Sequence, residues 1–534
     1  MDHKPQPLVA NTPGRTGRSP HPRSPIGRRG LLKLTAGAGV AAVGVAGRGL
    51  VLPWVHTGRA AQGEGLVEPE VRASRDGLLD TTLTASVMEV PVAGGTAIMR
   101  AYEGSVPGPT LRIRPGDLLR INLVNNLEAL PAGLPADNPF LCSPLAGPGH
   151  AAGTEHATTC DTNLHTHGFH VSPEGNSDNP FLRVAAGESL QYEFQLPPDH
   201  PSGVYHYHPH LHRAAHNQVF AGMVGGIVIE GDLDRLPGID GVPERMLILQ
   251  ATQLTPDGGS VIDQGAAAQS TYLRLVNGQL NPTMAIRPGE TQRWRVQNLT
   301  ASTTFRLRLD GHQLHQIAKD GNTLTETRTR DEIVLMPGER TEVLVQGGPA
   351  GTYALRTLPF STGFTTQVAA TLATLVSAGA AVTPQPLPTT LLPLPLGDLS
   401  TAEVDERRRI TFQMKPPIAP PTGLRGPAAL IDSRFFDAER DDQVVRLGAT
   451  EEWVIRNAST QWHPFHIHVN DYQVVAVNGQ PVPVRSAEDT TPVPPFGEIT
   501  IRTRFRDFPG RWVYHCHILL HEDHGMMGTV KALA

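Results

Sequence analysis

Apolar and polar residues alternate along three segments of the chain, residues 111–127, 284–300 and 444–460. Alternation with a period of two predicts a strand that buries one face. In each segment a glycine precedes an asparagine by nine positions: the pairs are Gly116 and Asn125, Gly289 and Asn298, and Gly448 and Asn457. The glycine predicts a turn before the strand. We therefore expect three copies of one β unit.

A second block recurs in step with the first. It reads PSGVYHYHPH at 201–210, PAGTYALRTL at 349–358 and FPGRWVYHCH at 508–517, with an aromatic residue two positions after each glycine. Copies at such spacing predict repeated β-sandwich domains rather than a parallel α/β sheet. We expect a first, a second and a third domain over residues 61–235, 236–382 and 383–534. The proline-rich residues 383–399 would connect the second domain to the third.

The composition agrees with an all-β protein. Of the 534 residues, 54 are glycine and 48 are proline, which suits a turn-rich chain, and the 39% hydrophobic fraction suffices for sizeable cores. The net charge is −6 and the pI is about 6.4, so no basic surface for nucleic acid or anionic membrane is evident. We expect no nucleic-acid partner.

Residues 1–60 have the features of a targeting signal. IGRRGLLKL at 26–34 precedes an apolar stretch that ends at Ala46, and this pattern resembles a twin-arginine export signal. The stretch is shorter than the roughly 20 residues that span a bilayer, so we expect no stable membrane span in the mature protein. Export by the twin-arginine machinery would place the protein in the periplasm or outside the cell. A chance arginine pair before an apolar run is the alternative.

Histidines are paired at i and i+2 in the first and third domains. The pairs are His165 and His167, His208 and His210, His466 and His468, and His515 and His517. On a strand, such residues point to the same side, and neutral imidazoles suit copper, zinc, iron or nickel. The second domain reads FRLRLDG and ALRTL at the matching places, with arginine in place of histidine. We therefore expect metal sites built jointly by the first and third domains.

Cys516 indicates which metal is bound. It lies between His515 and His517, so on a strand its side chain faces away from theirs. Three more candidate ligands could surround it: His463, His521 and Met526. Two histidines, one thiolate and a weak thioether form the ligand set of blue-copper electron-transfer sites. The alternative is a structural cysteine beside unrelated histidines.

The motifs HTHG, HPH, HPFHIH and HCHILLHEDHGMM resemble, in order and spacing, the copper signatures of the multicopper oxidases, in particular the laccase-like, three-domain bacterial type. The resemblance implies three cupredoxin-like Greek-key β-sandwich domains and four copper ions. It implies a type 1 copper at His463, Cys516, His521 and Met526. It implies a type 2 copper at His165 and His466. It implies a type 3 pair at His167, His208, His210, His468, His515 and His517.

The same resemblance implies an activity. A small reducing substrate, a phenol or an aromatic amine, would give single electrons to the type 1 copper at the edge of His463. Cys516 would pass them through His515 and His517 to the other three ions, where O2 becomes water. Asp178 and Glu522 stand at the positions of the family's proton-relay carboxylates. Asp178 could instead cap a turn, and Glu522 could serve only to orient a ligand.

Other functions stay open. A metallo-oxidase acting on Cu(I), Fe(II) or Mn(II) is the main alternative, although ten scattered methionines argue against a dedicated copper-efflux enzyme, because thioethers select Cu(I). A non-catalytic copper-binding or scaffold protein is an alternative of another class. Methionine at position 526 implies, by resemblance, a low to medium type 1 potential.

Several residues depart from the family pattern. His206 stands where many relatives have tryptophan, and we interpret it, with His170, His212 and His216, as an outer or surface group rather than a ligand. An insertion at 131–161 carries Cys142 and Cys160, which we expect to pair in an exported protein, with unpaired thiols as the alternative. Residues 359–376 could be ordinary second-domain structure or part of a substrate wall.

Overall fold

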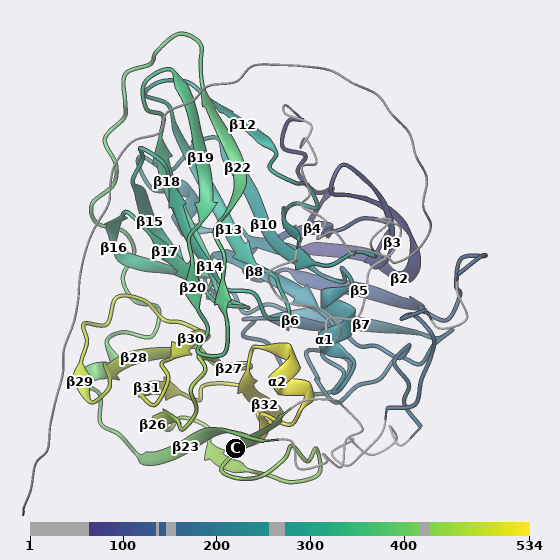
Figure 1. The fold of residues 1–534 in the computed structure, drawn as a ribbon. Coiled ribbons are helices and arrows are strands. Elements are labelled where there is room, and N and C mark those ends of the chain that lie inside the picture. The colour runs from purple at the N-terminus through teal and green to yellow at the C-terminus, as the bar shows by residue number, and fades with distance from the viewer. Residues whose placement is uncertain (1–63, 135–137, 146–155, 256–272, 417–426) are drawn as a thin grey trace, which may run out of the picture. The chain divides into compact units, whose positions relative to one another are not determined.

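The computed structural model describes residues 64–534 except 135–137, 146–155, 256–272 and 417–426. The predicted export signal at 1–60 lies outside the described residues. The described chain belongs to one compact unit, Arg59–Ala534, and is built almost entirely from strands (Figure 1). Within it, no helix has the length and apolar character needed to cross a membrane. The expected all-β class is confirmed.

The first domain is a sandwich of two sheets, with strand orders β1-β4-β9-β8-β6 and β3-β2-β5-β7. Its elements are β1 Val71–Ala73, β2 Leu78–Val92, β3 Gly95–Tyr102, β4 Gly108–Ile113, β5 Leu118–Asn126, β6 His165–His167, β7 Ser189–Gln195, β8 Gly203–His208, α1 Ala215–Phe220, β9 Gly225–Ile229 and the 3₁₀ turn η1 Asp232–Arg235.

The second domain has sheets in the orders β11-β10-β13-β18-β15-β16 and β12-β22-β19-β14-β17, and a hairpin of β20 and β21. Its elements are β10 Glu244–Thr252, β11 Leu273–Val276, β12 Thr283–Ile286, β13 Thr291–Asn298, β14 Phe305–Leu309, β15 Leu314–Lys319, β16 Asn322–Arg330, β17 Ile333–Leu335, β18 Arg340–Gln346, β19 Gly351–Thr357, β20 Phe360–Ser361, β21 Thr366–Gln367 and β22 Ala370–Ser377.

The third domain repeats the second, with sheet orders β24-β23-β26-β31-β28-β29 and β25-β33-β32-β27-β30. Its elements are the 3₁₀ turn η4 Leu399–Thr401, β23 Glu406–Lys415, β24 Ala428–Ile431, β25 Gln443–Arg446, β26 Thr450–Asn457, β27 His463–Ile467, β28 Tyr472–Val477, β29 Gln480–Pro481, β30 Thr490–Val493, β31 Glu498–Arg504, β32 Gly510–Cys516, α2 Leu519–Asp523 and β33 Met527–Leu533.

The topology explains both sequence repeats. The first block is a strand of one sheet, a turn and a strand of the other sheet, and the turn glycines Gly116, Gly289 and Gly448 all have φ between +80° and +88°. The asparagine amides each donate to two backbone carbonyls: Asn125 to Cys160 and Val184, Asn298 to Thr303 and Leu335, and Asn457 to Gln461 and Val493. Each asparagine therefore holds neighbouring loops together.

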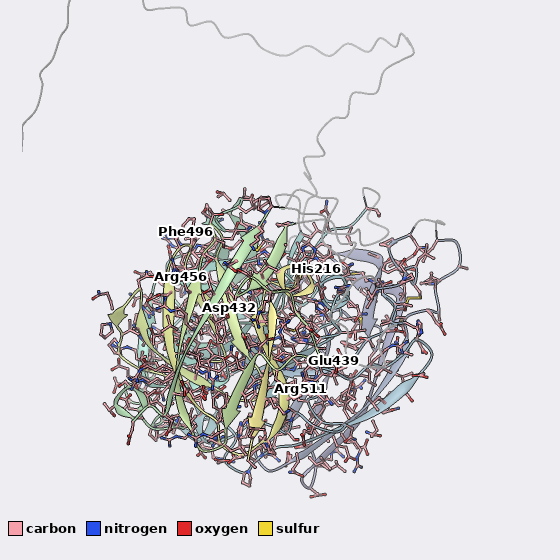
Figure 2. All side chains as sticks on the ribbon, turned by 90° about the horizontal axis from the view of Figure 1, so that it is seen from below. His216, Asp432, Glu439, Arg456, Phe496 and Arg511 are labelled. Carbon is pink, nitrogen blue, oxygen red and sulfur yellow. A yellow bond between two sulfur atoms is a disulfide. The ribbon has the colours of Figure 1, made fainter. Side chains whose placement is uncertain are left out.

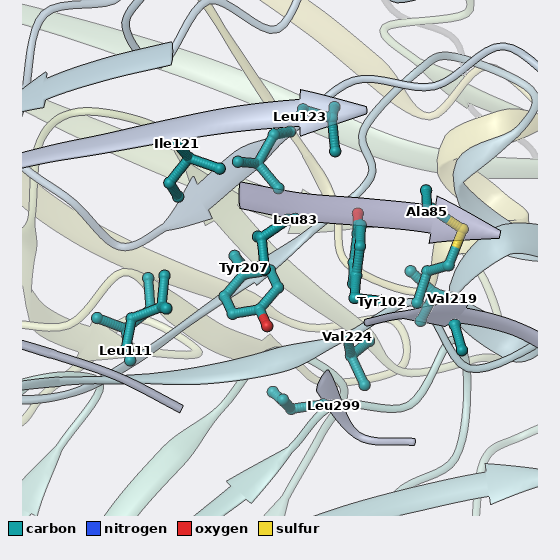
Figure 3. Packing of buried hydrophobic residues seen from close by; sticks show 14 of the residues in the cluster. Leu83, Ala85, Tyr102, Leu111, Ile121, Leu123, Tyr207, Val219, Val224 and Leu299 are labelled. Carbon is teal, nitrogen blue, oxygen red and sulfur yellow. The ribbon is translucent and has the colours of Figure 1, made fainter. Parts of the chain in front are cut away.

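Each sandwich encloses its own apolar core. In the first domain, Leu83 and Ile121 of one sheet pack toward Leu111 and Tyr207 of the other (Figure 3). The second and third domains have separate clusters, centred on Trp294 and Trp453. In the described residues no sheet crosses a predicted domain boundary, although the boundaries themselves stay predictions.

The first and third domains also contact each other directly. Arg511 on β32, labelled in Figure 2, lies over the ring of Phe181 at 5.1 Å from its centroid. Phe181 also packs against a small apolar cluster of the third domain that includes Phe436 and Val513. The histidine-bearing strands of the two domains are thereby held close together.

Candidate metal centre

The predicted ligand histidines come from equivalent strands of two domains. In the first domain, β6 and β8 are antiparallel neighbours, with His165 opposite His208. In the third domain, β27 and β32 pair in the same way, with His466 opposite His515. The matching strands of the second domain, β14 and β19, pair in the same way and carry no histidine.

The two sets of histidines converge on one buried centre. The Nε2 atom of His210 lies 3.1 Å from Nε2 of His515 and 3.2 Å from Nε2 of His468. Nitrogens that share one ion at about 2 Å are expected at such separations. Three histidine groups, each with ligand atoms within 4.8 Å, form the centre: His210, His468 and His515; His165, His466 and His468; and His167, His206, His208 and His517.

The nitrogen atoms of these side chains fit a metal. Four histidines have one ring nitrogen hydrogen-bonded to an oxygen atom while the other is buried with no partner. The free atoms are Nε2 of His165, His208 and His466 and Nδ1 of His167. Burial lowers the pKa of all four imidazoles, which favours the neutral form that a metal requires. Unpartnered buried nitrogens are costly unless an ion binds them.

His206 belongs to the largest group by distance but not by orientation. It is the cross-strand neighbour of His167, and the two rings stack with centroids 4.3 Å apart and an interplanar angle of 21°. Lone pairs of nearly parallel rings do not converge on one ion. His167 and His466 also stack, and these two residues belong to different predicted copper sites. Nδ1 of His206 is buried without a partner, like the free nitrogens above, and the interpretation of His206 as an outer group stays a prediction.

A second site lies on the other side of β32. The Sγ atom of Cys516 is 3.4 Å from Nδ1 of His463 and 3.6 Å from Nδ1 of His521, and the two nitrogens are 3.2 Å apart. Met526 is fully buried in the same core cluster as Cys516. Burial raises the pKa of the Cys516 thiol, so a bound cation is needed to hold the thiolate. The expected opposite orientation of Cys516 and its neighbours is confirmed.

The structure contradicts one expectation about this site. His463 is fully buried, and its outer nitrogen Nε2 is bonded to Oγ of Ser459 at 2.8 Å, so it presents no edge to an external donor. His521, on the short helix α2, retains 6% exposure. The sequence pattern could not distinguish the two histidines, because loop packing decides which one reaches the surface.

Both predicted carboxylates contact predicted ligands. The oxygens of Asp178 lie 3.0 Å from Nδ1 of His165, and the backbone N–H of Thr166 donates to one of them. Glu522 lies 3.0 Å from Nδ1 of His515 and 3.6 Å from Nδ1 of His210. Burial raises the pKa of Asp178 to about 8 and also raises the pKa of Glu522. Both predicted carboxylates therefore lie beside ring nitrogens of the histidine centre.

The other departures also have places in the structure. His170 bonds the carbonyl of Val469 and the carboxylate of Asp507, both in the third domain. The ring of His212 packs edge-to-face against the ring of Phe436, with centroids 4.8 Å apart. His216 lies on α1, outside the groups described above. Cys142 and Cys160 form a disulfide, as expected, and Cys516 is a free buried thiol.

Asp489 was not predicted as a site residue. Its Oδ1 atom lies 3.0 Å from Nε2 of His167, and its backbone carbonyl accepts a hydrogen bond from Nδ1 of His466. Nothing in the segment SAEDTTPV distinguishes this aspartate from a loop residue. Only the pairing of β30 with β27 brings it to the centre.

Comparisons with known proteins agree with this geometry. Family profiles described as multicopper oxidase match residues 155–234, 243–380 and 403–533. The chain is 26% identical to the multicopper oxidase mco of Staphylococcus haemolyticus, over 80% of this chain and 83% of that protein. It is 25% identical to a laccase of Bacillus stratosphericus, over 80% and 89%. A solved multicopper oxidase of Campylobacter jejuni, described as a metallo-oxidase, superimposes with a TM-score of 0.71 at 26% identity, covering 88% of this chain and 95% of the other.

Proposed function

Because the chain belongs to the multicopper oxidase family and is therefore an oxidoreductase, we propose that it is a laccase-like enzyme. It oxidises phenols or aromatic amines by one electron at a time and reduces O2 to water with four electrons. One observation carries the proposal: a single strand, β32, presents Cys516 to one buried site and His515 to another. That arrangement joins a one-electron site to a multi-ion site by covalent bonds.

We propose four copper ions with the ligands implied by the sequence. The type 1 ligands are His463, Cys516, His521 and Met526. The type 2 ligands are His165 and His466. The type 3 ligands are His167, His208, His210, His468, His515 and His517. The grouping of free nitrogens supports this division. Bound copper would supply one-electron redox chemistry at the first site and O2 binding and reduction at the others.

The protein's own residues organise electron and proton delivery. His521 is the side of the type 1 site that reaches the surface, so the donor docks there rather than at His463. Cys516 is bonded through the main chain to His515 and His517, which face the O2-reducing centre. Asp178 and Glu522 lie beside Nδ1 of two histidines of that centre, His165 and His515, where the carboxylates can take up and release protons. Reduction of O2 to water consumes four protons, so such groups are required.

An organic donor suits the surroundings of His521. The adjacent carboxylates of Glu522 and Asp523 are buried, as are the thioethers of Met526 and Met527, so among these neighbours no exposed ligand awaits a metal ion. The segment 359–376 includes the β20–β21 hairpin, whose Thr362 carbonyl accepts from the N–H of Trp462, just before His463. Its exposed Phe364 gives that hairpin an aromatic surface. The hairpin therefore lies on the His463 side of the proposed type 1 site, and its part in a substrate wall stays a proposal.

A metallo-oxidase acting on Fe(II), Cu(I) or Mn(II) is the second candidate. The observation in its favour is the Campylobacter jejuni structure, which is described as a metallo-oxidase. Its superposition on this chain covers 95% of that protein. A metal donor would need ligands that the described neighbours of His521 do not expose. We therefore rank it second.

We propose that the mature protein is periplasmic or extracellular, exported by the twin-arginine machinery. The arginine pair at 28–29 and the apolar stretch after it support this route. The Cys142–Cys160 disulfide supports an oxidising compartment.

The test is a visible spectrum of the copper-loaded protein together with O2 uptake on a phenol, Fe(II) and Cu(I) in turn. We expect a blue band that bleaches under an anaerobic donor and returns in air, with the phenol as the fastest donor. A faster rate with Fe(II) or Cu(I) would select the metallo-oxidase. A blue protein that takes up no O2 with any donor would contradict an oxidase.

A further inference from the structure

We propose that Arg340, in the domain that supplies no predicted copper ligand, is a positioning residue for the O2-reducing copper centre. Arg340 fixes the carboxylate of Asp489, and Asp489 fixes His167 so that Nδ1 is presented to copper. The inference rests on the proposed copper ligands. It assigns the second domain a part in building the centre, in addition to its place between the other two domains in the sequence.

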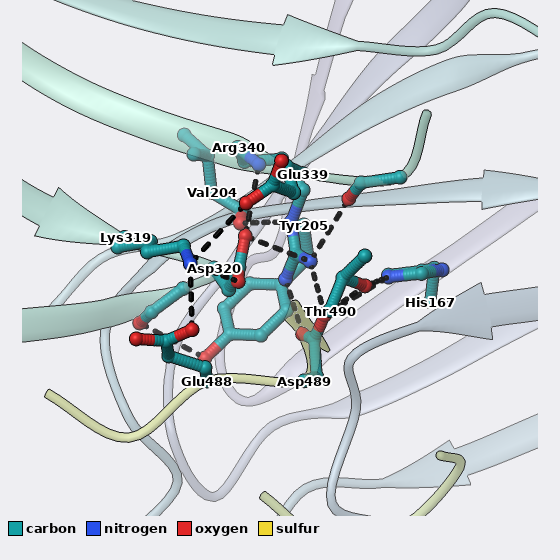
Figure 4. A network of polar contacts seen from close by, with 12 residues as sticks. His167, Val204, Tyr205, Lys319, Asp320, Glu339, Arg340, Glu488, Asp489 and Thr490 are labelled. Carbon is teal, nitrogen blue, oxygen red and sulfur yellow. Dashed lines mark hydrogen bonds and ion pairs between the residues drawn. The ribbon is translucent and has the colours of Figure 1, made fainter. Parts of the chain in front are cut away.

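Arg340 opens β18 and is fully buried where the three domains meet (Figure 4). Its Nη1 and Nη2 atoms donate to Oδ1 and Oδ2 of Asp489 at 2.6 and 2.7 Å. Its Nε atom donates to the carbonyl of Val204 on β8 of the first domain at 3.2 Å. A bidentate pair of this kind fixes the orientation of both groups, which a single contact does not.

Asp489 passes this orientation to a predicted ligand. Oδ1 lies 3.0 Å from Nε2 of His167, and Oγ1 of Thr490 donates to the same oxygen at 2.8 Å. A carboxylate oxygen accepts, so Nε2 of His167 carries the proton and the lone pair is on Nδ1. That Nδ1 is buried without a partner, as a ligand atom would be. Outer contacts of this type set the tautomer and ring orientation of metal-binding histidines.

The second domain holds Arg340 firmly in turn. The backbone N–H of Arg340 donates to Oδ1 of Asp320, and Nη1 donates to the carbonyl of Gly338. Gly338 has φ +88°, and a Cβ atom there would lie 2.8 Å from Nδ1 of His517, another predicted ligand. The start of β18 therefore approaches the centre at two places. Arg340 reaches His167 through Asp489, and Gly338 lies against His517.

The test uses the copper-loaded protein and two variants. Arg340→Met removes the donors but keeps an unbranched side chain, and Arg340→Lys keeps the charge without the bidentate geometry. The measurements are copper per chain, the blue absorption of the type 1 site, and the electron paramagnetic resonance and near-ultraviolet signals of the other three ions. In the described part of the chain, the side chain of Arg340 bonds to Val204, Gly338 and Asp489 and to none of the proposed type 1 ligands, so the blue band serves as an internal standard.

We expect Arg340→Met to keep the blue band and to bind copper at the O2-reducing centre 10- to 100-fold more weakly, the usual size of an outer-contact effect. Arg340→Lys should lie between this variant and the wild type. Asp489→Asn should give the same defect, because an amide no longer offers the carboxylate pair. The double variant Arg340→Met, Asp489→Asn should then lose no more than either single variant, since both act through one contact.

Arg295→Met is the matched control. Arg295 is equally buried in the second domain and pairs with Asp234, Glu244 and Glu342, none of which is a predicted ligand. Full copper content and unchanged signals in Arg340→Met would overturn the inference. Equal loss of all four ions in Arg340→Met and Arg295→Met would also overturn it, because that result indicates a general folding defect. Failure of the wild type to bind copper would instead contradict the proposed function.

Discussion

In several of the predicted ligand histidines, an oxygen atom beside one ring nitrogen leaves the other nitrogen free. The carboxylate of Asp178 engages Nδ1 of His165, while the carbonyl of Pro209 lies 2.9 Å from Nδ1 of His208. Glu522 contacts Nδ1 of His515. Each contact leaves the opposite nitrogen directed to the centre. Of these three groups, the carboxylates of Asp178 and Glu522 can also take up a proton, whereas the carbonyl of Pro209 cannot.

Glu522→Gln tests proton delivery at this scale. An amide keeps the shape but cannot store and release a proton, so reoxidation of the reduced enzyme by O2 should slow about 10- to 100-fold. Anaerobic bleaching of the blue band by the donor should be unchanged, because it precedes the O2 reaction. Stopped-flow measurement of the two half-reactions separates them. Equal reoxidation rates in variant and wild type would limit Glu522 to orienting His515.

At the scale of the elements, the glycine and the asparagine of the repeated β unit have separate roles. Its glycine makes the turn between the two sheets, and its asparagine holds the loop after the second strand. In the third domain that loop leads to His463, a proposed type 1 ligand. Oδ1 of Asn457 accepts from Oγ of Ser459 at 2.9 Å, and Oγ of Ser459 lies 2.8 Å from Nε2 of His463. One structural motif thus acquires a role in a site through the loop that it holds.

Asn457→Ala tests that role, with Asn298→Ala as its counterpart in the second domain. Both substitutions leave buried carbonyls unpaired and should lower the free energy of unfolding by about 1–3 kcal/mol for each group left unsatisfied. Only Asn457→Ala should also shift or weaken the blue band, because Ser459 and His463 lose their support. Denaturant unfolding and visible spectra measure the two effects. A blue band unaltered in Asn457→Ala would refute the link.

At the scale of the whole molecule, the predicted O2-reducing centre takes ligands from the first and third domains and contacts from the second. His210 faces His515 across the domain boundary, and Arg340 reaches both other domains. Ions bound between domains couple their stabilities, because binding requires the docked arrangement.

Copper removal tests that coupling. The copper-free protein should unfold at a lower temperature, since its buried imidazoles lose their partner ions and native-state binding no longer contributes to stability. Calorimetry before and after chelation, and again after copper is restored, measures the effect. Identical unfolding temperatures in all three samples would show that the ions contribute nothing to domain docking.

Much of this molecule follows from local sequence. The three alternating segments and their glycines predict one strand and the turn before it in each domain, because burying one face of a strand needs that period. The paired histidines around Cys516 predict two sites on one strand for the same reason. Asp489 and Arg340 could not be found this way, since each is an ordinary residue of a turn or strand edge until the domains pack.

The sequence by itself determined the fold class, the threefold repeat and the types of ligand side chain, because these depend on periodicity and on the chemistry of imidazole and thiolate. Only the tertiary structure decided which histidine of the proposed type 1 site keeps some exposure and which oxygens lie beside several of the imidazoles. Those properties depend on contacts between residues hundreds of positions apart, such as His167 with Asp489, and no local pattern records them.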